Sequence, residues 1–427
     1  MTGPDTRGDI PELYILWHPD CRIGRPLADA IYCWLRPGRG LGPDIFFRSL
    51  PAPGKPLGCL PLPLPSEAPP MDDSREGRSR LANLEVVVPL VDANMVADPA
   101  WRHWIDSLAK ARSGSDTPRV LFPVALDATA YKMPGIVQSM NYLRPAGIAV
   151  LPEGETQGPA FERVARSLLK QLTEALCRWI LPRRTGTKPA PDMTAKIAIF
   201  LSHSKQDGTV PAQRLRDYIY GQTQMAAFYD ENDIAFGTAF KRILDDRLSS
   251  EDTAALIAIR SKSYANRPWC CRELSMFRKP QQGKRKDGRE QWRLYPTLVV
   301  EALDGSDCSP GIAEIGNSTI VRWNKADQDL EEFIVTTVIR DAMLSAYHSA
   351  LGAALPARTA PSAYQRRVVI NWLPDPMTLL HILAAKPKLR GPVEILYPGR
   401  GLSGQELDIL LEVFPKITFC SFEEALA

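Results

Sequence analysis

Short apolar runs rich in valine and isoleucine alternate along the chain with longer segments in which apolar residues recur at helical spacing. In the middle of the chain, the predicted strands are 195–202, 225–230, 253–260, 295–303 and 318–323. Helices are predicted between and after them at 211–221, 239–250, around residue 273 and at about 326–352. Strands that are apolar on both faces and separated by helices are typical of parallel sheets with right-handed crossovers. The pattern therefore predicts a parallel α/β domain.

The first part of the chain repeats this order of elements. Five strand-bearing segments correspond to those of the middle part, and a helix at about 160–180 closes the series. The segments are 12–20, 43–49, 83–106, 119–127 and 147–152. Five correspondences in the same order predict a tandem duplication. The alternative is that two unrelated parallel α/β domains share this order of elements.

Proline-rich segments divide the chain. The segment 49–80 is predicted to be a surface loop, because proline interrupts both helices and central strands. Two further segments have the composition of linkers, and the last part has strand–helix–strand–helix–strand character and is expected to pack on the middle domain. The prediction is an α/β chain of two tandem parallel-sheet domains and a small C-terminal α/β module. The boundaries are 1–183 for the first domain, 184–194 for a linker, 195–354 for the second domain, 355–365 for a linker and 366–427 for the module.

The bulk composition excludes several classes of function. The chain has 427 residues and a net charge of +3, which gives no electrostatic reason to expect nucleic acid or an anionic membrane as a partner. No run of about 18 apolar residues is present, and the first residues lack the pattern of a signal peptide, so no membrane span is expected. The eight cysteines include no C-x-x-C pair, which predicts reduced thiols, a cytoplasmic location and no metal site.

The stretch SKSYANRPWCCRELSMF, residues 261–277, holds the strongest candidate chemistry. Asn266 can cap a helix, Pro268 suits its first turn, and Trp269 and Glu273 then lie four residues apart on one helix face. The helix follows a predicted strand, so it begins at the sheet edge where open parallel sheets bind ligands. An aromatic ring beside a carboxylate can hold a flat heterocycle next to a charge. The alternative is that Trp269 is a packing anchor and Glu273 a solvated surface acid.

Three motifs in order carry a resemblance to a known family. They are IFLSHSKQD at 199–207, YDENDIAFGTAF at 229–240 and SKSYANRPWCCRE at 261–273. Together, at about residues 195–350, they resemble the Toll/interleukin-1 receptor (TIR) domain family, which implies that the sheets are flavodoxin-like. The second motif is similar to the loop after the second strand of the family, with Asp230, Asp233 and Gly237. The third is similar to its Ser-x-x-Tyr and Trp-Cys-x-x-Glu signature, with Ser261, Tyr264, Trp269, Cys270 and Glu273.

The resemblance to the enzymatic, bacterial branch of the family implies a reaction. In that branch, the glutamate of the Trp-Cys-x-x-Glu motif is catalytic, so Glu273 is expected to promote cleavage of the nicotinamide–ribose bond of NAD+. The products are nicotinamide and either ADP-ribose or a cyclic isomer. NAD+ is the substrate, and no cofactor is expected. The residues expected to bind the substrate are Ser202, His203, Trp269, Asp230, Asp233 and Tyr264, although a capping serine and a surface histidine are the alternative for the first two.

One carboxylate suffices for this reaction. The pyridinium ring of NAD+ is already a good leaving group, so no general acid has to protonate it. Positive charge develops on the ribose in the transition state, as in glycoside hydrolysis. A fixed carboxylate stabilises that charge, and a nearby helix N-terminus helps to keep it ionised.

The first domain offers an internal contrast. Aligning Trp101 with Trp269 places Ile105 where the middle domain has Glu273. Asp106 is one position further on, and one residue rotates a helical side chain by about 100° off the site face. We therefore expect this degenerate TIR-like copy to be a non-catalytic partner module.

The resemblance also bears on partners and on the alternatives. It implies self-association through TIR domains, a role in bacterial antiphage defence, and activation by a protein or a nucleotide signal. The alternative function is a non-enzymatic adaptor that acts through TIR–TIR contacts in signalling, and a weaker one is an enzyme acting on another N-ribosyl compound. The basic segment 277–293 is expected to be a solvated loop, and 397–406 a turn with a helix cap.

Overall fold

The computed structural model describes most of the chain as two compact units, one formed by residues 9–176 and the other mainly by residues 177–426. The structure describes residues 10–37, 41–49, 81–110, 118–152, 155–180, 198–223, 226–229, 254–283, 290–303, 311–312, 315–316, 318–324, 329–355, 366–385, 392–399 and 402–426. Several predicted segments therefore lie outside the described residues, wholly or almost so: the proline-rich loop at 49–80, the helix at 239–250, and the linkers at 184–194 and 355–365.

The first unit is built on a parallel sheet. Its strands are β1 (Pro11–Trp17), β2 (Ile45–Arg48), β3 (Leu84–Val91), β4 (Arg119–Leu121) and β5 (Val124–Ala125). Their order is β2-β1-β3-β4. Strand β5 also pairs with β3, at Leu90 and Val91, further along β3 than β4 does. The longer helices are α1 (Gly24–Leu35), α4 (Pro99–Lys110) and α5 (Pro159–Ile180), and a short helix α3 (Ala93–Ala97) precedes α4.

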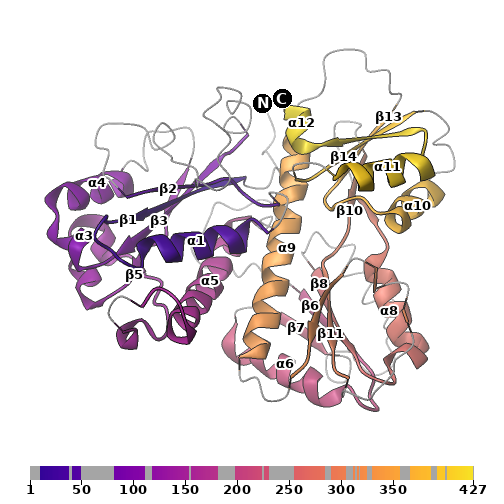
Figure 1. Cartoon of the computed structure of the whole chain (residues 1–427), viewed down its shortest axis with the longest axis horizontal. Coiled ribbons are helices and arrows are strands. Elements are labelled where there is room, and N and C mark those ends of the chain that lie inside the picture. Colours follow the sequence, from indigo (N-terminus) through magenta and orange to yellow (C-terminus); the bar gives the residue numbers. More distant parts are fainter. Residues whose placement is uncertain are drawn as a thin grey trace, which may run out of the picture. The chain divides into compact units, whose positions relative to one another are not determined.

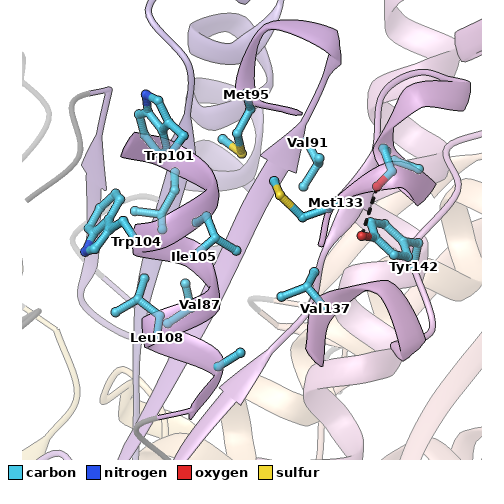
Figure 2. Close-up of a cluster of buried hydrophobic side chains, with 14 of the residues drawn as sticks. Val87, Val91, Met95, Trp101, Trp104, Ile105, Leu108, Met133, Val137 and Tyr142 are labelled. Carbon is cyan, nitrogen blue, oxygen red and sulfur yellow. Dashed lines mark hydrogen bonds between the residues drawn. The ribbon is translucent and has the colours of Figure 1, made fainter. Parts of the chain in front are cut away.

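Aromatic and aliphatic side chains of α4 fill the core on one side of this sheet (Figure 2). Trp101, Trp104 and Ile105 are each at most 2% exposed. They belong to one cluster with Met133 and Val137, which come from the irregular segment after β5. Burial of large apolar side chains is the main stabilising contribution to such a sheet.

The predicted fifth strand of this unit, at 147–152, is wrong. Residues Ile148–Val150 form a single turn of 3-10 helix, labelled η6, instead. Gly147 starts this turn with a φ angle of +83°, a conformation that only glycine adopts readily. Val150 is 76% exposed, so the apolar residues that suggested a strand do not enter the core.

The middle of the chain forms a second parallel sheet, as predicted. Its strands are β6 (Ala198–His203), β7 (Ala226–Tyr229), β8 (Ala254–Arg260), β11 (Thr297–Glu301) and β12 (Thr319–Arg322), in the order β12-β11-β8-β6-β7. This is the flavodoxin-like order 5-4-3-1-2. The first four strands of the first sheet have the same order, β2-β1-β3-β4. The predicted fold class, tandem flavodoxin-like sheets, is confirmed.

Helices cover both faces of the middle sheet (Figure 1). Helix α8 (Pro268–Arg278) packs on one face, where Leu274 and Phe277 join a core cluster with Phe200. Helices α6 (Thr209–Gln222) and α9 (Leu330–Ala354) lie on the other face. Most of the side chains described in β6, β8 and β11 are therefore buried on both faces, which explains why the sequence shows these strands as continuous apolar runs.

The C-terminal segment does not complete a sheet by itself. Its strands β13 (Arg366–Ile370), β14 (Val393–Tyr397) and β15 (Ile417–Ser421) continue into β10 (Glu290–Arg293) and β9 (Gln281–Gly283). Strand β10 runs parallel to β13, and β9 is antiparallel to β10. The expectation that 277–293 is a solvated loop is therefore wrong for its two flanks. These flanks form β9 and β10, which are short and mostly polar. Trp292 of β10 is their one large apolar side chain, and it enters the C-terminal core.

The remaining helices of this unit are α10 (Pro376–Ala385), α11 (Gly404–Val413) and α12 (Phe422–Leu426). Ser403 caps α11 in a capping box with Glu406, which confirms the predicted helix cap, while part of the predicted turn at 397–406 lies outside the described residues. No helix in the part of the chain that the structure describes is both long and apolar enough to span a membrane.

A histidine is buried in helix α9. His348 is 7% exposed, and its Nε2 atom has no hydrogen-bond partner among the described residues. Burial lowers the pKa of His348 to about 4, and a hydrogen bond to the backbone of Asn371 opposes this only in part. The folded chain therefore holds His348 in its neutral form.

This burial predicts a loss of stability in mild acid. Because the folded pKa of about 4 lies below the unfolded value of 6.5, the unfolded chain binds a proton in this window that the folded chain does not. The contribution of neutral His348 to the free energy of unfolding is complete above pH 6.5. It falls by about 3 kcal/mol as the pH drops towards 4. Denaturant titrations between pH 4 and 7 should show a shallower loss for His348→Leu than for the wild type. The exposed His381, changed to Gln, is the control, and equal pH slopes for wild type and His348→Leu would contradict the prediction.

Candidate functional site

The candidate site lies at the carboxyl ends of two neighbouring strands. Strands β6 and β8 pair in parallel, with His203 opposite Ile259, near the end of each strand. The strand order reverses between them, because β7 lies on one side of β6 and β11 on the far side of β8. Open α/β sheets bind ligands at such a point.

The segment after β8 leads into helix α8 through a tight turn. Residues Tyr264–Asn266 form a 3-10 turn, labelled η7, and the amide of Arg267 donates to the carbonyl of Tyr264 at 3.0 Å. Arg267 is the N-cap and Pro268 occupies the first turn, as predicted for Pro268. The expected cap by Asn266 is wrong, because Asn266 is part of the 3-10 turn and the helix begins after it.

Polar contacts tie the loop after β6 to the loop after β8. The carboxylate of Asp207 accepts hydrogen bonds from the Ser261 hydroxyl at 2.5 Å and from the Ser263 amide at 2.8 Å. Burial alone raises the pKa of Asp207, but these hydrogen bonds outweigh it and lower the pKa overall. The Arg267 guanidinium adds a third bridge, donating to Gln206 at 2.7 Å. The start of α8 is therefore fixed to the end of β6.

A buried hydroxyl pair lies beneath this contact. Tyr264 is 0% exposed and Ser202 is 2% exposed, and their hydroxyl oxygens are 2.9 Å apart in a shared hydrogen bond. The Tyr264 hydroxyl also donates to the carbonyl of Cys270 in the first turn of α8, at 3.2 Å. Burial raises the pKa of Tyr264, and the charge of Glu273 adds to this effect, so the phenol stays protonated. Two of the predicted substrate-binding residues thus lie under the surface and anchor α8.

Trp269 and Glu273, in the first and second turns of α8, are more exposed than the residues that anchor the helix. Cys270 and Leu274 point into the core, whereas Trp269 is 60% exposed and Glu273 is half-buried. The Arg272 guanidinium is 5.4 Å from the centre of the Trp269 ring, a cation–π distance.

The remaining predicted site residues have different outcomes. His203, the last residue of β6, is 7% exposed, and its carbonyl accepts a hydrogen bond from the Cys270 thiol at 3.4 Å. Asp230 and Asp233 lie outside the described residues. The structure thus brings His203, Ser202 and Tyr264 together with the start of α8, while their contacts with a substrate stay a prediction.

Sequence reasoning missed the residues that join the two loops. Asp207 stands at the end of the quoted motif 199–207, where an acid after a polar turn was the available signal. Gly208, directly after it, gives a second signal: a Cβ atom there would lie 3.1 Å from the carbonyl oxygen of Ser204 and 3.2 Å from the Cβ of His203. The loop after β6 thus depends on a close approach of its own backbone.

Helix α4 of the first unit differs from α8 at the position of the carboxylate. Both helices begin with a proline, Pro99 and Pro268. Matching their buried faces aligns Trp101 with Cys270, Ile105 with Leu274 and Leu108 with Phe277, all at most 6% exposed. The predicted alignment of Trp101 with Trp269 is therefore wrong by one residue, because burial follows the helix start and not the tryptophan. Trp104, which is 2% exposed and belongs to the core of the first unit (Figure 2), therefore aligns with Glu273.

The hydroxyl pair predicts a measurable energetic coupling. Tyr264→Phe and Ser202→Ala should each lower the free energy of unfolding, by about 1–3 kcal/mol. The first change takes the partner of the buried Ser202 hydroxyl, and the second takes one of the two hydrogen bonds of the buried Tyr264 hydroxyl. The double variant should lose less than the sum of the two, since it removes both partners. Urea denaturation of the four proteins tests this, and strict additivity would show that the two hydroxyls do not interact.

Comparison with known families identifies the middle of the chain. A family model described as TIR domain matches residues 199–334. The match covers strands β6 to β12, the loops of the candidate site and the first residues of α9. Curated proteins give no match to the chain. Residues 199–334, which contain the motifs SHSKQD and WCCRE, form a TIR domain.

Proposed function

We propose that the chain is an NAD+ glycohydrolase with Glu273 as its catalytic residue. One observation carries the proposal: a half-buried carboxylate follows an exposed tryptophan by one turn, on a helix whose start is fixed at the reversal point of the sheet. The side chains that could bind a ring and those that could stabilise a charge therefore share one rigid element. TIR domains are compatible with this activity and with adaptor roles.

The proposed reaction follows from the charge of Glu273. The C–N bond between ribose and nicotinamide breaks with its electron pair moving to the pyridinium nitrogen, so nicotinamide leaves as a neutral molecule. The ribose becomes cation-like, and the Glu273 carboxylate stabilises that charge. Attack by water gives ADP-ribose and releases a proton, whereas attack by the adenine ring of the same molecule gives a cyclic isomer. The reaction needs no resident cofactor.

The other residues have supporting roles in the proposal. The exposed face of Trp269 stacks on a ring of the substrate, and His203, Asp230 and Asp233 are candidate contacts for the rest of the molecule. Ser202 and Tyr264 lie beneath them, and the Tyr264 phenol keeps its proton because burial raises its pKa. They act on the substrate by holding the first turn of α8.

The biological setting is part of the same proposal. We infer a cytoplasmic antiphage or immune effector that becomes active by self-association through its TIR domain, with a protein or a nucleotide signal as activator. The first unit then contributes recognition or assembly, since Trp104 fills the position that Glu273 holds in α8. Its core at that position is apolar and leaves no charge to stabilise a cationic sugar.

A second candidate function is an adaptor that assembles a complex through TIR contacts. The exposed Trp269, with the Arg272 guanidinium at its ring, favours this candidate, because tryptophan and arginine dominate the energetics of protein interfaces. The two functions differ in what they require of Glu273. In an adaptor, the shape and polarity of the Glu273 side chain suffice for a protein contact, whereas the enzyme needs the negative charge of Glu273.

Replacing the carboxylate by its neutral isostere separates the two functions. Glu273→Gln should lower the rate of NAD+ consumption by about 100- to 1,000-fold, because the charge that stabilises the transition state is gone. Nicotinamide release is measured with concentrated protein, to allow self-association. Glu412→Gln, an exposed acid of α11, is the matched control and should keep the wild-type rate. Equal turnover of wild type and Glu273→Gln would exclude Glu273 as the catalytic residue and favour the adaptor.

The exposed ring predicts a substrate-binding effect without a stability effect. Trp269→Ala should raise KM by about tenfold or more, because stacking of a base on an aromatic ring contributes about 1–3 kcal/mol. Trp269→Phe keeps a ring and should stay closer to the wild type. Both variants should unfold at the wild-type denaturant concentration, since the side chain is 60% exposed. A KM that is the same for the alanine and phenylalanine variants would argue against stacking.

A further inference from the structure

Helix α8 is joined directly to the C-terminal sheet. It ends at Arg278, and after Lys279 and Pro280 the chain enters strand β9. Strand β9 pairs with β10, which pairs with β13 of the C-terminal segment. Three residues, 294–296, then lead from β10 to β11 in the TIR sheet. The two strands after α8 therefore belong to the C-terminal sheet and not to the TIR sheet.

A buried amide holds this junction together. Asn371, which is 5% exposed, follows β13, and its Oδ1 atom accepts a hydrogen bond from the Leu294 amide at 2.9 Å. Its Nδ2 atom donates to the hydroxyls of Ser345 at 2.8 Å and Ser349 at 3.1 Å, both on α9. The Gln291 side chain in β10 donates to the Ser349 carbonyl at 2.8 Å. One side chain thus connects the β10–β11 connection, the end of β13 and α9.

Packing around the junction leaves little freedom for movement. A Cβ atom at Gly352 of α9 would lie 2.6 Å from Val369 of β13 and 3.0 Å from the ring of Phe422, so the helix backbone lies directly on the C-terminal sheet. Trp292 of β10 is 4% exposed inside the C-terminal core. At the end of α8, the Arg278 guanidinium lies 3.1 Å from the Cβ position of Gly316. Displacement of β10 would therefore be passed to β9 and to the end of α8.

We propose that the C-terminal sheet positions helix α8 for catalysis, and that Asn371 is the positioning residue. Its contacts hold β10 and β9 in place, β9 holds the end of α8, and α8 carries Trp269 and Glu273 as one rigid element. The inference rests on the proposed function of Glu273. It assigns part of the active arrangement to residues beyond 334, where the TIR family match ends. A misplacement of about 1 Å far from the chemistry can lower a rate by about 100-fold.

The test uses the full chain labelled with fluorotryptophan, so that the position of α8 is measured without reference to activity. The fluorine resonance of Trp269 is assigned with Trp269→Phe. Asn371→Ala should shift or broaden this resonance and increase hydrogen exchange in β9 and α8. It should also lower kcat for NAD+ by about 10- to 100-fold with KM nearly unchanged. Ser403→Ala, which removes the capping box of α11, is the control for a general loss of stability in the same sheet.

The outcomes separate this inference from the proposed function. If the wild type consumes no NAD+, the proposed function fails, whereas the fluorine and exchange measurements still decide whether Asn371 positions α8. An unchanged Trp269 resonance and unchanged exchange in α8 for Asn371→Ala would overturn the inference, whatever the activity. The same shifts in Ser403→Ala would also overturn it, since they would reflect general loosening. If Asn371→Ala does not fold, Ser349→Ala removes one acceptor of Asn371 and should give a smaller shift in the same direction.

Discussion

The hydrogen bond between Ser202 and Tyr264 is the contact on which the candidate site depends. It lies between strand β6 and the segment that opens helix α8, with both side chains almost fully buried. Inside a protein an unpartnered hydroxyl is costly, so this pair has few alternative arrangements. Above it, Asp207 ties the two loops together at the surface. Two layers of polar contacts therefore hold the first turn of α8, which carries Trp269, and Glu273 follows in the next turn of the same helix.

The sequence predicted the strands whose burial produces a continuous apolar run. It missed the strands that join a larger sheet only by pairing with a strand far away in the chain. Strands β6, β8 and β11 are apolar runs because helices cover both faces of their sheet. Strands β9 and β10 are short and mostly polar. They pair with each other, and only the pairing of β10 with β13, which follows more than 70 residues later, joins them to a larger sheet. In the site, motif residues such as Trp269 and Glu273 could be found, whereas Asn371 could not. Its partner Leu294 is 77 positions away, and no local pattern reports such a contact.

The two flavodoxin-like sheets show how one framework can be used in two ways. In α4, the positions of the buried face hold Trp101, Ile105 and Leu108, and Trp104 adds a further aromatic ring to the same core. In α8, the position equivalent to Trp104 is the half-buried Glu273, a charged side chain instead of an aromatic ring. A buried aromatic side chain contributes about 3–5 kcal/mol of stability, which a partly exposed carboxylate does not. The first sheet is thus built for stability at the position where the second one keeps a charge.

Strand β9 has a consequence for how copies of the chain can meet. An unpaired strand at the edge of a sheet is a template on which another chain can add a strand and aggregate. Strand β9 spans only Gln281–Gly283, runs antiparallel to β10, and contains no apolar side chain. So short and polar an edge gives an incoming strand few backbone groups and no apolar surface to pair with. Intermolecular strand addition is therefore disfavoured on the side of the C-terminal sheet that is joined to α8.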